Sequence, residues 1–438
     1  FYLFHQRDTR KPCPFGEPFG WDLAVTSDFV HYEDKGTALP RGTDEEQDQF
    51  IFAGSVFEAE GKYHIFYTGF NRDYPKLGKA SQVLMHAESD DLLNWTKTQD
   101  KLTFTPQEGY DPDDWRDPFV IWNEEKQEYL LVLGTRKAGP KEQQTGRTVK
   151  FTSKDLKKWK FEGDFWAPGL FTMHEMPDLF QIGDWWYHII SEYSDGNKMV
   201  YRMSKSLDGP WIAPADDAFD GRAYYAGRTF CLNGQRILFG WVPTKENCDD
   251  RGNFEWAGTF VAHEVYQRED GTLGVRIPDT VWNAFDEGEK TEDIVIDTPY
   301  ARQEQILFND TTDLFRFEAD VEFSEGTRSF ELRFYENEET SQSYQYLFNI
   351  EENRYRFETS PNMPWPANQN IGLERPIRLE AGKKYHIQMI LDDTIATIYV
   401  DGVALNTRFY QKFGQSLSLF VTDGTLTVTN AGLSKTIK

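Results

Sequence analysis

The sequence predicts an all-β protein in which a β-propeller is followed by a C-terminal antiparallel β-sandwich. Three observations support this. A strand-and-turn unit recurs before residue 285, helical periodicity is almost absent there, and apolar–polar alternation begins after residue 300. The chain has 438 residues, which is enough for two or three domains. We predict a propeller domain over residues 1–285, a linker over 286–300 and a sandwich over 301–438.

The repeating unit is a short polar turn closed by an aromatic residue, with an apolar strand before it. The turn recurs at near-equal spacing, and the expected strands are rich in β-branched and aromatic residues. Repeats of this kind indicate a solenoid or a propeller, and four-stranded blades fit best because they leave only short sheet edges. The turns lie at residues 27–32, 89–95, 153–159 and, more loosely, 204–211, and the strands at 63–67, 129–133, 186–190 and 236–241.

The C-terminal part alternates apolar and polar residues with period two, which is typical of half-buried strands in a sandwich. Two Asp-Gly pairs, Asp401-Gly402 and Asp423-Gly424, are expected to be turns between such strands. The acidic stretch 286–299 lacks bulky aromatics, and for this reason we expect the domain boundary there. The alternating segments are 315–321, 329–335, 385–391 and 394–400.

The composition excludes several classes of partner. The net charge of −25 would repel nucleic acid and anionic membrane surfaces, and no apolar stretch is long enough to span a membrane. The three cysteines, Cys13, Cys231 and Cys248, are odd in number and lack zinc-site spacing, so no disulfide framework is expected. This favours a cytoplasmic over a secreted location. No cofactor or metal motif is present, and the sequence predicts no oligomeric state.

Two carboxylates are the candidates for chemistry. Asp117 follows Arg116, and Glu175 lies about one repeat further on, each just before an expected apolar strand. We therefore expect them at equivalent positions in successive blades, facing one pocket. Glycoside cleavage needs such a pair, one acid to protonate the leaving oxygen and one carboxylate to stabilise the cationic transition state. Arg116 could keep Asp117 ionised or bind sugar hydroxyls. The competing interpretation is that both acids merely form turns.

Six segments, read in order, resemble glycoside hydrolase family 32, the invertases, inulinases and levanases. The resemblance covers about residues 1–280, and it implies a five-bladed propeller plus a sandwich, retaining chemistry and β-D-fructofuranosyl substrates. Weaker matches lie at residues 224–226 and 256–258. The six segments are 1–6, 21–32, 52–55, 116–118, 175–179 and 236–241.

The resemblance also implies roles. Asp117 would be the transition-state stabiliser and Glu175 the general acid/base. The expected fructosyl subsite is lined by Gln6, Trp21, Phe52, Ser55, Arg116 and Tyr225, and Asp22, His174 and Trp256 are further candidates for substrate binding.

The chain departs from the family pattern at four points. Asp22 stands where the family has Gly in Trp-Gly-His, which puts ordinary sucrose or inulin specificity in doubt. Met176 replaces the common Cys, and Ala53 replaces a Ser. The family's nucleophilic Asp lies in a Trp-Met-Asn-Asp-Pro-Asn-Gly motif, which does not occur in these 438 residues. We expect it shortly before Phe1, an expectation that an intact mass matching the 438 residues alone would contradict.

Two other functions stay open at this point. One is an inverting arabinofuranosidase or arabinanase of the family 43 type, which also has a propeller with three acids. The other is a non-catalytic sugar-binding propeller. The sequence does not distinguish hydrolysis from fructosyl transfer, because both use the same glycosyl-enzyme.

Overall fold

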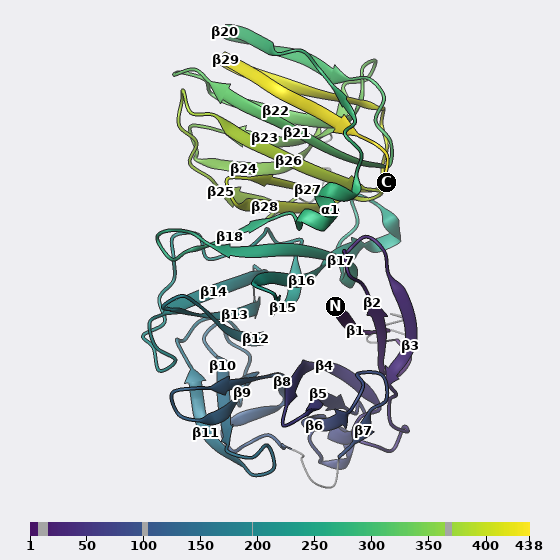
Figure 1. The fold of residues 1–438 in the computed structure, drawn as a ribbon, viewed down its shortest axis with the longest axis vertical. Coiled ribbons are helices and arrows are strands. Elements are labelled where there is room, and N and C mark those ends of the chain that lie inside the picture. Colours follow the sequence, from purple (N-terminus) through teal and green to yellow (C-terminus); the bar gives the residue numbers. More distant parts are fainter. Residues whose placement is uncertain (8–15, 99–103, 195, 364–369) are drawn as a thin grey trace. The chain divides into compact units, whose positions relative to one another are not determined.

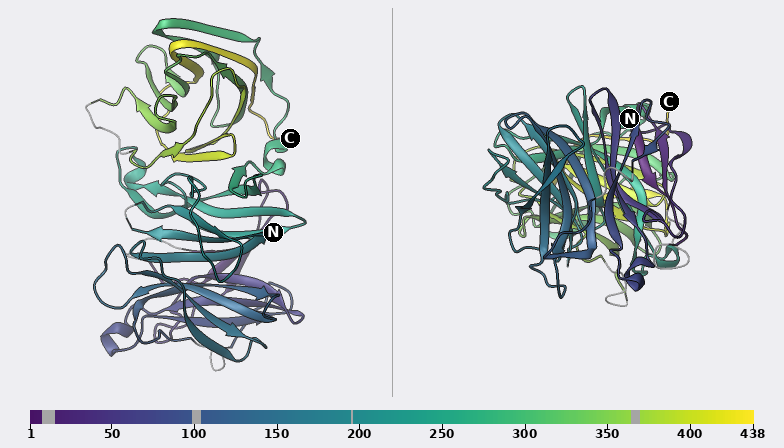
Figure 2. Two further views of the ribbon diagram at one scale, coloured as in Figure 1. Left: turned by 90° about the vertical axis from the view of Figure 1, so that its left-hand side faces the viewer. Right: turned by 90° about the horizontal axis from the view of Figure 1, so that it is seen from below.

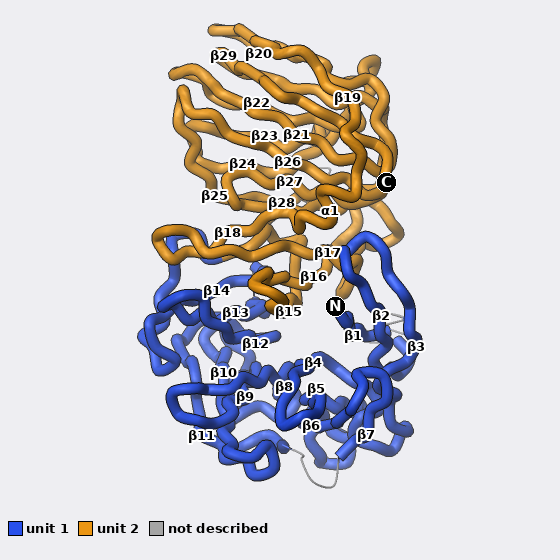
Figure 3. The backbone as a smooth tube through the Cα atoms, viewed as in Figure 1, with its two compact units in different colours: residues 1–217 blue, residues 218–438 orange. Residues whose placement is uncertain are grey.

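The computed structural model describes residues 1–7, 16–98, 104–194, 196–363 and 370–438. Their regular secondary structure consists almost entirely of β-strands (Figure 1). The helical segments among them are α1 (Asp279–Ala284) and the 3₁₀ turns η1 (Tyr74–Leu77) and η2 (Glu246–Cys248). No helix in these ranges is long and apolar enough to cross a membrane. The chain divides into two compact units, residues 1–217 and 218–438 (Figure 3).

The first unit contains four antiparallel sheets. In this unit β8 lies against β4, β5 and β6, while β12 lies against β8, β9 and β10, so the first strands of neighbouring sheets adjoin, as in a propeller. The sheets are β1 (Tyr2–Gln6), β2 (Trp21–Val25) and β3 (Glu33–Leu39); β4 (Phe50–Ala59), β5 (Lys62–Phe70), β6 (Gln82–Ser89) and β7 (Thr96–Lys97); β8 (Tyr110–Asn123), β9 (Glu128–Lys137), β10 (Gly146–Ser153) and β11 (Trp159–Trp166); and β12 (Met173–Ile182), β13 (Trp185–Tyr193) and β14 (Met199–Ser204).

The predicted polar turns repeat one hydrogen-bond pattern. In the turn after β6, Ser89 Oγ accepts from the backbone N–H groups of Asp91 and Leu92, at 3.1 and 3.0 Å. Asp91 Oδ1 then accepts from the next two N–H groups, and Trp95 Nε1 donates to Leu92 O at 3.1 Å. The turns closed by Tyr32 and Trp159 match this pattern. In the turn closed by Tyr32 the first acceptor is Thr26, one residue before the predicted turn. Ser, Thr and Asp occupy these positions because their side chains accept from turn N–H groups that no strand can pair.

The second unit contains a fifth sheet and the C-terminal sheet. The fifth sheet is β15 (Tyr225–Leu232), β16 (Gln235–Lys245), β17 (Phe254–Gln267) and β18 (Leu273–Arg276). The C-terminal sheet curls into a nearly closed sandwich (left view of Figure 2). The five-bladed propeller with a C-terminal sandwich is thus confirmed. The sandwich strands, in sheet order, are β25 (Glu374–Pro376), β24 (Arg354–Ser360), β23 (Gln342–Asn349), β22 (Ser329–Asn337), β29 (Ser416–Ser434), β21 (Leu314–Phe323), β26 (Tyr385–Asp392), β27 (Ile395–Val400) and β28 (Val403–Arg408).

A buried polar network joins the fifth sheet to the sandwich within this unit. His263 Nδ1 lies 2.7 Å from Tyr399 Oη, and its Nε2 lies 3.1 Å from Asp220 Oδ2. Asn406 Nδ2 donates to the same Asp220 oxygen at 2.5 Å. Because these side chains are almost inaccessible to water, each relies on the others for its hydrogen bonds. These hydrogen bonds join the fifth sheet to strands β27 and β28 of the sandwich.

Residues 286–300, expected to be a linker, include paired strands. β19 (Glu289–Lys290) and the first half of β20 (Ile294–Phe308) both pair with β29. The domain limits themselves stay a prediction.

One predicted turn is confirmed and the other is wrong. Asp401-Gly402 is a turn between β27 and β28. Asp423-Gly424 lies inside β29, where Asp423 has a φ of 50°. The long strand bends at this point instead of reversing, and its first half pairs with β22 while its second half pairs with β21. A residue with positive φ can lie in a turn or inside an irregular strand, and the pairing with partner strands determines which of the two forms.

Candidate active site

β-Bulges shape the strands that carry Asp117 and Glu175. On β8, Arg116 pairs with Gly134 and Phe119 with Val132, so one residue is extra. On β12, Glu175 pairs with Ser191 and Asp178 with Ile189, so β12 also has one extra residue relative to its partner strand. The two bulges begin with positive φ values, 63° at Asp117 and 50° at Met176. Bulges of this kind re-aim side chains and are common beside active sites.

The bulges correct one expectation. Asp117 and Glu175 do not occupy equivalent positions: by register, Asp117 corresponds to Met176 and Arg116 corresponds to Glu175. The two carboxylates are therefore offset by one residue along their strands. What joins them is Arg116 and a backbone N–H group.

Arg116 bridges the two strands. Its Nη2 and Nε donate to the same oxygen, Glu175 Oε1, at 2.6 and 3.1 Å. Its Nε lies 4.0 Å from Asp117 Oδ2, and its Nη1 donates to Asp114 Oδ1 at 2.8 Å. Burial opposes the charge of Arg116, but the three carboxylates raise its pKa above the usual value. The guanidinium is therefore a fixed positive charge between the acids.

Asp117 is held from two sides. Its backbone N–H donates to Thr68 Oγ1 at 2.9 Å, and its Oδ2 accepts from the N–H of Met176 at 3.1 Å. Asp117 and Glu175 are 4% and 5% exposed. Buried carboxylates persist only when they are paired or hydrogen-bonded, and both of these are. The arrangement thus presents two ordered carboxylates around one guanidinium.

Close backbone contact brings the strands together. Gly134, on β9 opposite Arg116, has no side chain, and a Cβ there would lie 1.9 Å from His174 O on β12. Any larger residue would push β12, and with it Glu175, away from Arg116. Gly134 is therefore required by the packing of these two sheets.

A second ion-pair layer lies behind Arg116. Arg136 Nε donates to Asp114 Oδ2 at 2.5 Å, and its Nη2 donates to Asp111 Oδ2. Burial alone would raise the pKa of Asp114, but the Arg116 guanidinium and the hydrogen bonds from Arg116 and Arg136 hold it at about 2. Asp114 is therefore ionised at any working pH.

The expected sugar-binding residues on β1 and β2 are neighbours, but their side chains have different surroundings. Trp21 is 5% exposed and packs in a core with Leu39, Ile51 and Tyr67. Asp22, its neighbour, has its side chain on the other face of β2, where Oδ1 accepts from Thr37 Oγ1 at 2.8 Å and Oδ2 lies 3.6 Å from Arg7. Gln6 is exposed at the end of β1, paired with Trp21 in register.

Phe52 and Ser55 lie on β4. Phe52 stacks on Phe70 with 4.6 Å between ring centroids, and it pairs in register with Thr68, the residue that holds Asp117. Ser55 is 7% exposed, and its Oγ has no hydrogen-bond partner among the described residues. Phe52 is thus tied to the carboxylate site through its strand partner.

His174 lies outside the carboxylate cluster. Its side chain is inaccessible to water, and its ring nitrogens lie 3.1 Å from Thr148 Oγ1 and from Leu170 O. Burial lowers its pKa to about 3. Successive residues on a strand point to opposite faces, so His174 and Glu175 face different surroundings.

Tyr225 and Trp256 belong to the second unit. Together with Trp241 they form an aromatic cluster on β15, β16 and β17, with ring centroids 5.5 Å apart in each pair. Trp256 is 51% exposed. An exposed indole face of this kind suits contact with a sugar ring.

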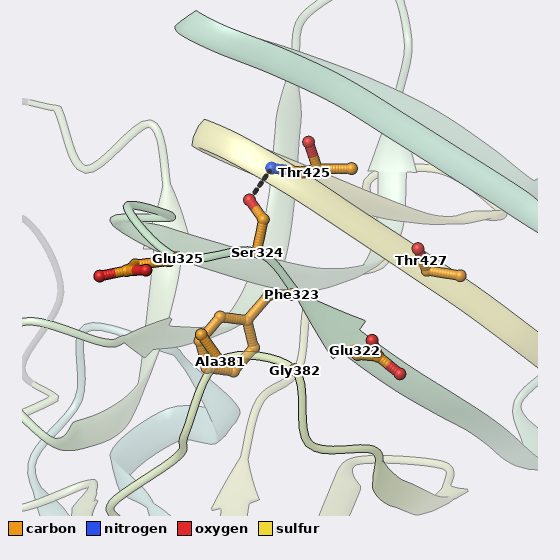
Figure 4. A pocket seen from close by; sticks show the side chains of 8 residues that line it. All are labelled: Glu322, Phe323, Ser324, Glu325, Ala381, Gly382, Thr425 and Thr427. Carbon is orange, nitrogen blue, oxygen red and sulfur yellow. Dashed lines mark hydrogen bonds between the residues drawn. The ribbon is translucent and has the colours of Figure 1, made fainter.

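A cavity of about 560 Å³ lies elsewhere, on the sandwich. Figure 4 shows Glu322 and Glu325 on its rim, pointing in different directions, and the N–H of Thr425 donating to Ser324 Oγ at 3.1 Å. It contains neither Asp117 nor Glu175. Over the described parts of the chain, no group of three or more His, Cys, Asp or Glu side chains could hold a metal ion.

The comparisons with known proteins agree with this architecture. Residues 1–264 match the family model of the Glycosyl hydrolases family 32 N-terminal domain, and residues 286–435 match that of the Glycosyl hydrolases family 32 C terminal. The chain belongs to glycosyl hydrolase family 32.

Its relatives include a sucrose-6-phosphate hydrolase of Escherichia coli, 25% identical over an alignment of 282 positions that covers 58% of this chain and 55% of that protein. The chain thus spans about half the length of this relative. The levanbiose-producing levanase of Bacillus subtilis is 22% identical over an alignment of 480 positions that covers 98% of this chain and 84% of the levanase. Among solved structures, a sucrose-6-phosphate hydrolase from Lactobacillus gasseri has a TM-score of 0.78 at 19% identity, covering 100% of this chain and 88% of that one. At this identity the structural likeness concerns the fold.

Sequence reasoning missed several residues around the carboxylates: Thr68, Gln82, Asp111, Asp114 and Arg136. The acidic run before Arg116 was a signal for two of them. Arg136 and Thr68 end ordinary-looking apolar strands, and nothing local in the sequence marks them.

Proposed function

We propose that this chain cleaves β-D-fructofuranosides, with Glu175 as general acid/base and Asp117 as stabiliser of the cationic transition state. The observation that carries this proposal is the Arg116 bridge, which orders two buried carboxylates on neighbouring blades. Fructoside cleavage develops positive charge on the sugar ring and needs a proton on the leaving oxygen. An ordered carboxylate beside an acid meets both needs.

The two acids are held differently. Asp117 accepts a backbone N–H bond from Met176. Glu175, near the start of β12, accepts two bonds from Arg116 at one oxygen, Oε1. The different roles proposed for them rest on the positions of the two acids in motifs that resemble those of family 32. The family's nucleophile motif does not occur in these residues, so the roles proposed here concern Asp117 and Glu175.

The names of the relatives support a fructoside substrate, since they include a levanase and a sucrose-6-phosphate hydrolase. We propose that the fructosyl unit is bound by Arg116 with Phe52 and Ser55, and by further contacts from the expected subsite residues Gln6, Trp21 and Asp22. In the second unit, Trp256 with Tyr225 beside it stays a separate candidate for sugar contact. His174 is left out of this set because its ring is fully buried. Membership of family 32 sets aside the family 43 alternative.

The test is a product screen with sucrose, inulin, levan and arabinan, followed by chromatography. We expect fructose or fructo-oligosaccharides from at least one fructoside and nothing from arabinan. Asp117→Asn, which keeps the hydrogen-bond acceptor for Met176 but removes the charge, should lower kcat by about 10²-fold or more. Sugar binding without turnover by the full-length protein would favour a non-catalytic propeller instead.

A further inference from the structure

We propose that Asp114 and Arg136 are positioning residues that hold Arg116 against Glu175. The kinetic part of this proposal rests on the proposed function. Both residues belong to one chain of alternating charges that ends at Glu175. The chain runs from Asp111 through Arg136, Asp114 and Arg116 to Glu175.

Arg116 needs an anchor because it carries its charge on a long side chain. Two of its nitrogens bond Glu175 Oε1, at 2.6 and 3.1 Å. The third, Nη1, is held by Asp114 Oδ1 at 2.8 Å and by Gln82 Oε1 at 3.2 Å. With Nη1 fixed, the planar guanidinium can present only its Nε–Nη2 edge to Glu175. Asp114 thus decides which edge of Arg116 meets the acid.

Asp114 is itself fixed by Arg136. The Asp114 oxygen that does not bond Arg116, Oδ2, accepts from Arg136 Nε at 2.5 Å. Arg136 Nη1 donates to the carbonyl oxygens of Lys137 and Gly139, at 3.2 and 2.8 Å. Arg136 and Asp114 are only 6% and 5% exposed. The guanidinium of Arg136 therefore has no freedom to swing, and it holds Asp114 in one orientation.

The charges reinforce the geometry. Arg116 lies among three carboxylates, those of Asp114, Asp117 and Glu175. If Asp114 loses its charge, the guanidinium is drawn only by the two proposed catalytic acids, and the Nε of Arg116 can approach Asp117, now 4.0 Å away. Such a shift changes the orientation of Glu175 without removing either acid. Displacements of about 1 Å at a reacting group can cost about 10²-fold in rate.

A purely structural brace is the competing role. Residues 111–114 lie where β8 leaves its register with β9, between Tyr110 and Trp115, and ion pairs there would stabilise the irregular strand. A brace predicts a loss of stability with unchanged turnover. A positioning role predicts a loss of turnover in molecules that are folded.

The test compares Asp114→Asn with Asp113→Asn in the full chain. Asp113 is the neighbouring residue, and it accepts a hydrogen bond from Ser81 Oγ at 2.5 Å rather than from an arginine. We expect Asp114→Asn to lower kcat by about 10- to 100-fold with little change in KM, whereas Asp113→Asn should keep both within about twofold. Arg136→Lys, which keeps the charge but loses the planar fork, should fall between wild type and Arg136→Gln.

A crystal structure of Asp114→Asn gives a readout that does not need activity. The proposal expects Arg116 to leave at least one of its two bonds to Glu175 Oε1. Unchanged bonds at 2.6 and 3.1 Å, or a wild-type kcat in the folded variant, would overturn it. If Asp114→Asn does not fold, the kcat and the crystal structure of Arg136→Lys test the proposal in the same way. A wild-type protein inactive on every fructoside would instead refute the proposed function, and the crystal structure would still test the positioning.

Discussion

Glu175→Gln should lower kcat for an unactivated fructoside such as sucrose by about 10²- to 10⁴-fold, the usual contribution of a general acid. The amide keeps an oxygen that can accept from Arg116 Nη2 and Nε, so the local structure should persist. It cannot give a proton to the departing oxygen. The measurement is steady-state hydrolysis at several pH values with the wild-type chain in parallel.

Two controls separate chemistry from folding. An aryl fructoside has a good leaving group that needs little protonation. Glu175→Gln should therefore slow the cleavage of its glycosidic bond much less than that of sucrose. Glu192→Gln changes an equally buried glutamate on the adjacent strand β13 and should leave kcat near wild type. The Glu192 carboxylate accepts a hydrogen bond from Ser194 Oγ. If Glu175→Gln slowed the cleavage of sucrose and of the aryl fructoside equally, Glu175 would not be the general acid.

Buried histidines should make the first unit labile in mild acid, and three of them have strongly lowered pKa values. Burial lowers the pKa of His86 to about 4 and the pKa values of His174 and His188 to about 3 each. In the unfolded chain their pKa is that of an ordinary histidine, about 6.5, so below that pH the unfolded state binds more protons than the folded state. Stability is therefore lost as the pH falls from about 6.5 towards 4. At pH 5 each of these histidines should lower the free energy of unfolding by about 2 kcal/mol.

The measurement is urea unfolding, followed by tryptophan fluorescence, at pH 7.5, 6.5, 5.5 and 5.0. Replacing one histidine, as in His188→Gln, should reduce the pH dependence below pH 6.5 by about 1.4 kcal/mol per pH unit. The same change at the exposed His5 should leave the slope as in wild type. Glu304 in the second unit acts in the opposite direction, since burial and the neighbouring Glu336 raise its pKa to about 7. If the free energy of unfolding had the same pH dependence in wild type and His188→Gln, the buried histidines would not be the cause of the acid lability.

The repeated turns and strands could be predicted because their causes are local. Ser89, Asp91 and Trp95 make their bonds within seven consecutive residues, and the same pattern recurs along the first unit. The apolar strands are recognisable for the same reason, since burial on a sheet imposes a pattern on each strand separately. The carboxylates Asp117 and Glu175 could be found because they stand beside such strands within recognisable motifs.

The remaining features depend on pairing between distant segments. The offset of Asp117 relative to Glu175 arises from bulges, which are defined only by the register with β9 and β13. Asp423-Gly424 has turn chemistry, yet two partner strands keep β29 continuous through it. Arg136 meets Asp114 across the sheet, and its position in an apolar run carries no sign of that partner.

The central claim is that the Arg116-linked carboxylates form the fructosyl site, and the most direct test is a crystal structure of Glu175→Gln with a bound fructo-oligosaccharide. The account predicts a terminal fructosyl unit with hydroxyls within about 3 Å of the Asp117 carboxylate and the glycosidic oxygen next to residue 175. A sugar seen only elsewhere, for instance in the cavity beside Ser324 and Thr425, would contradict it.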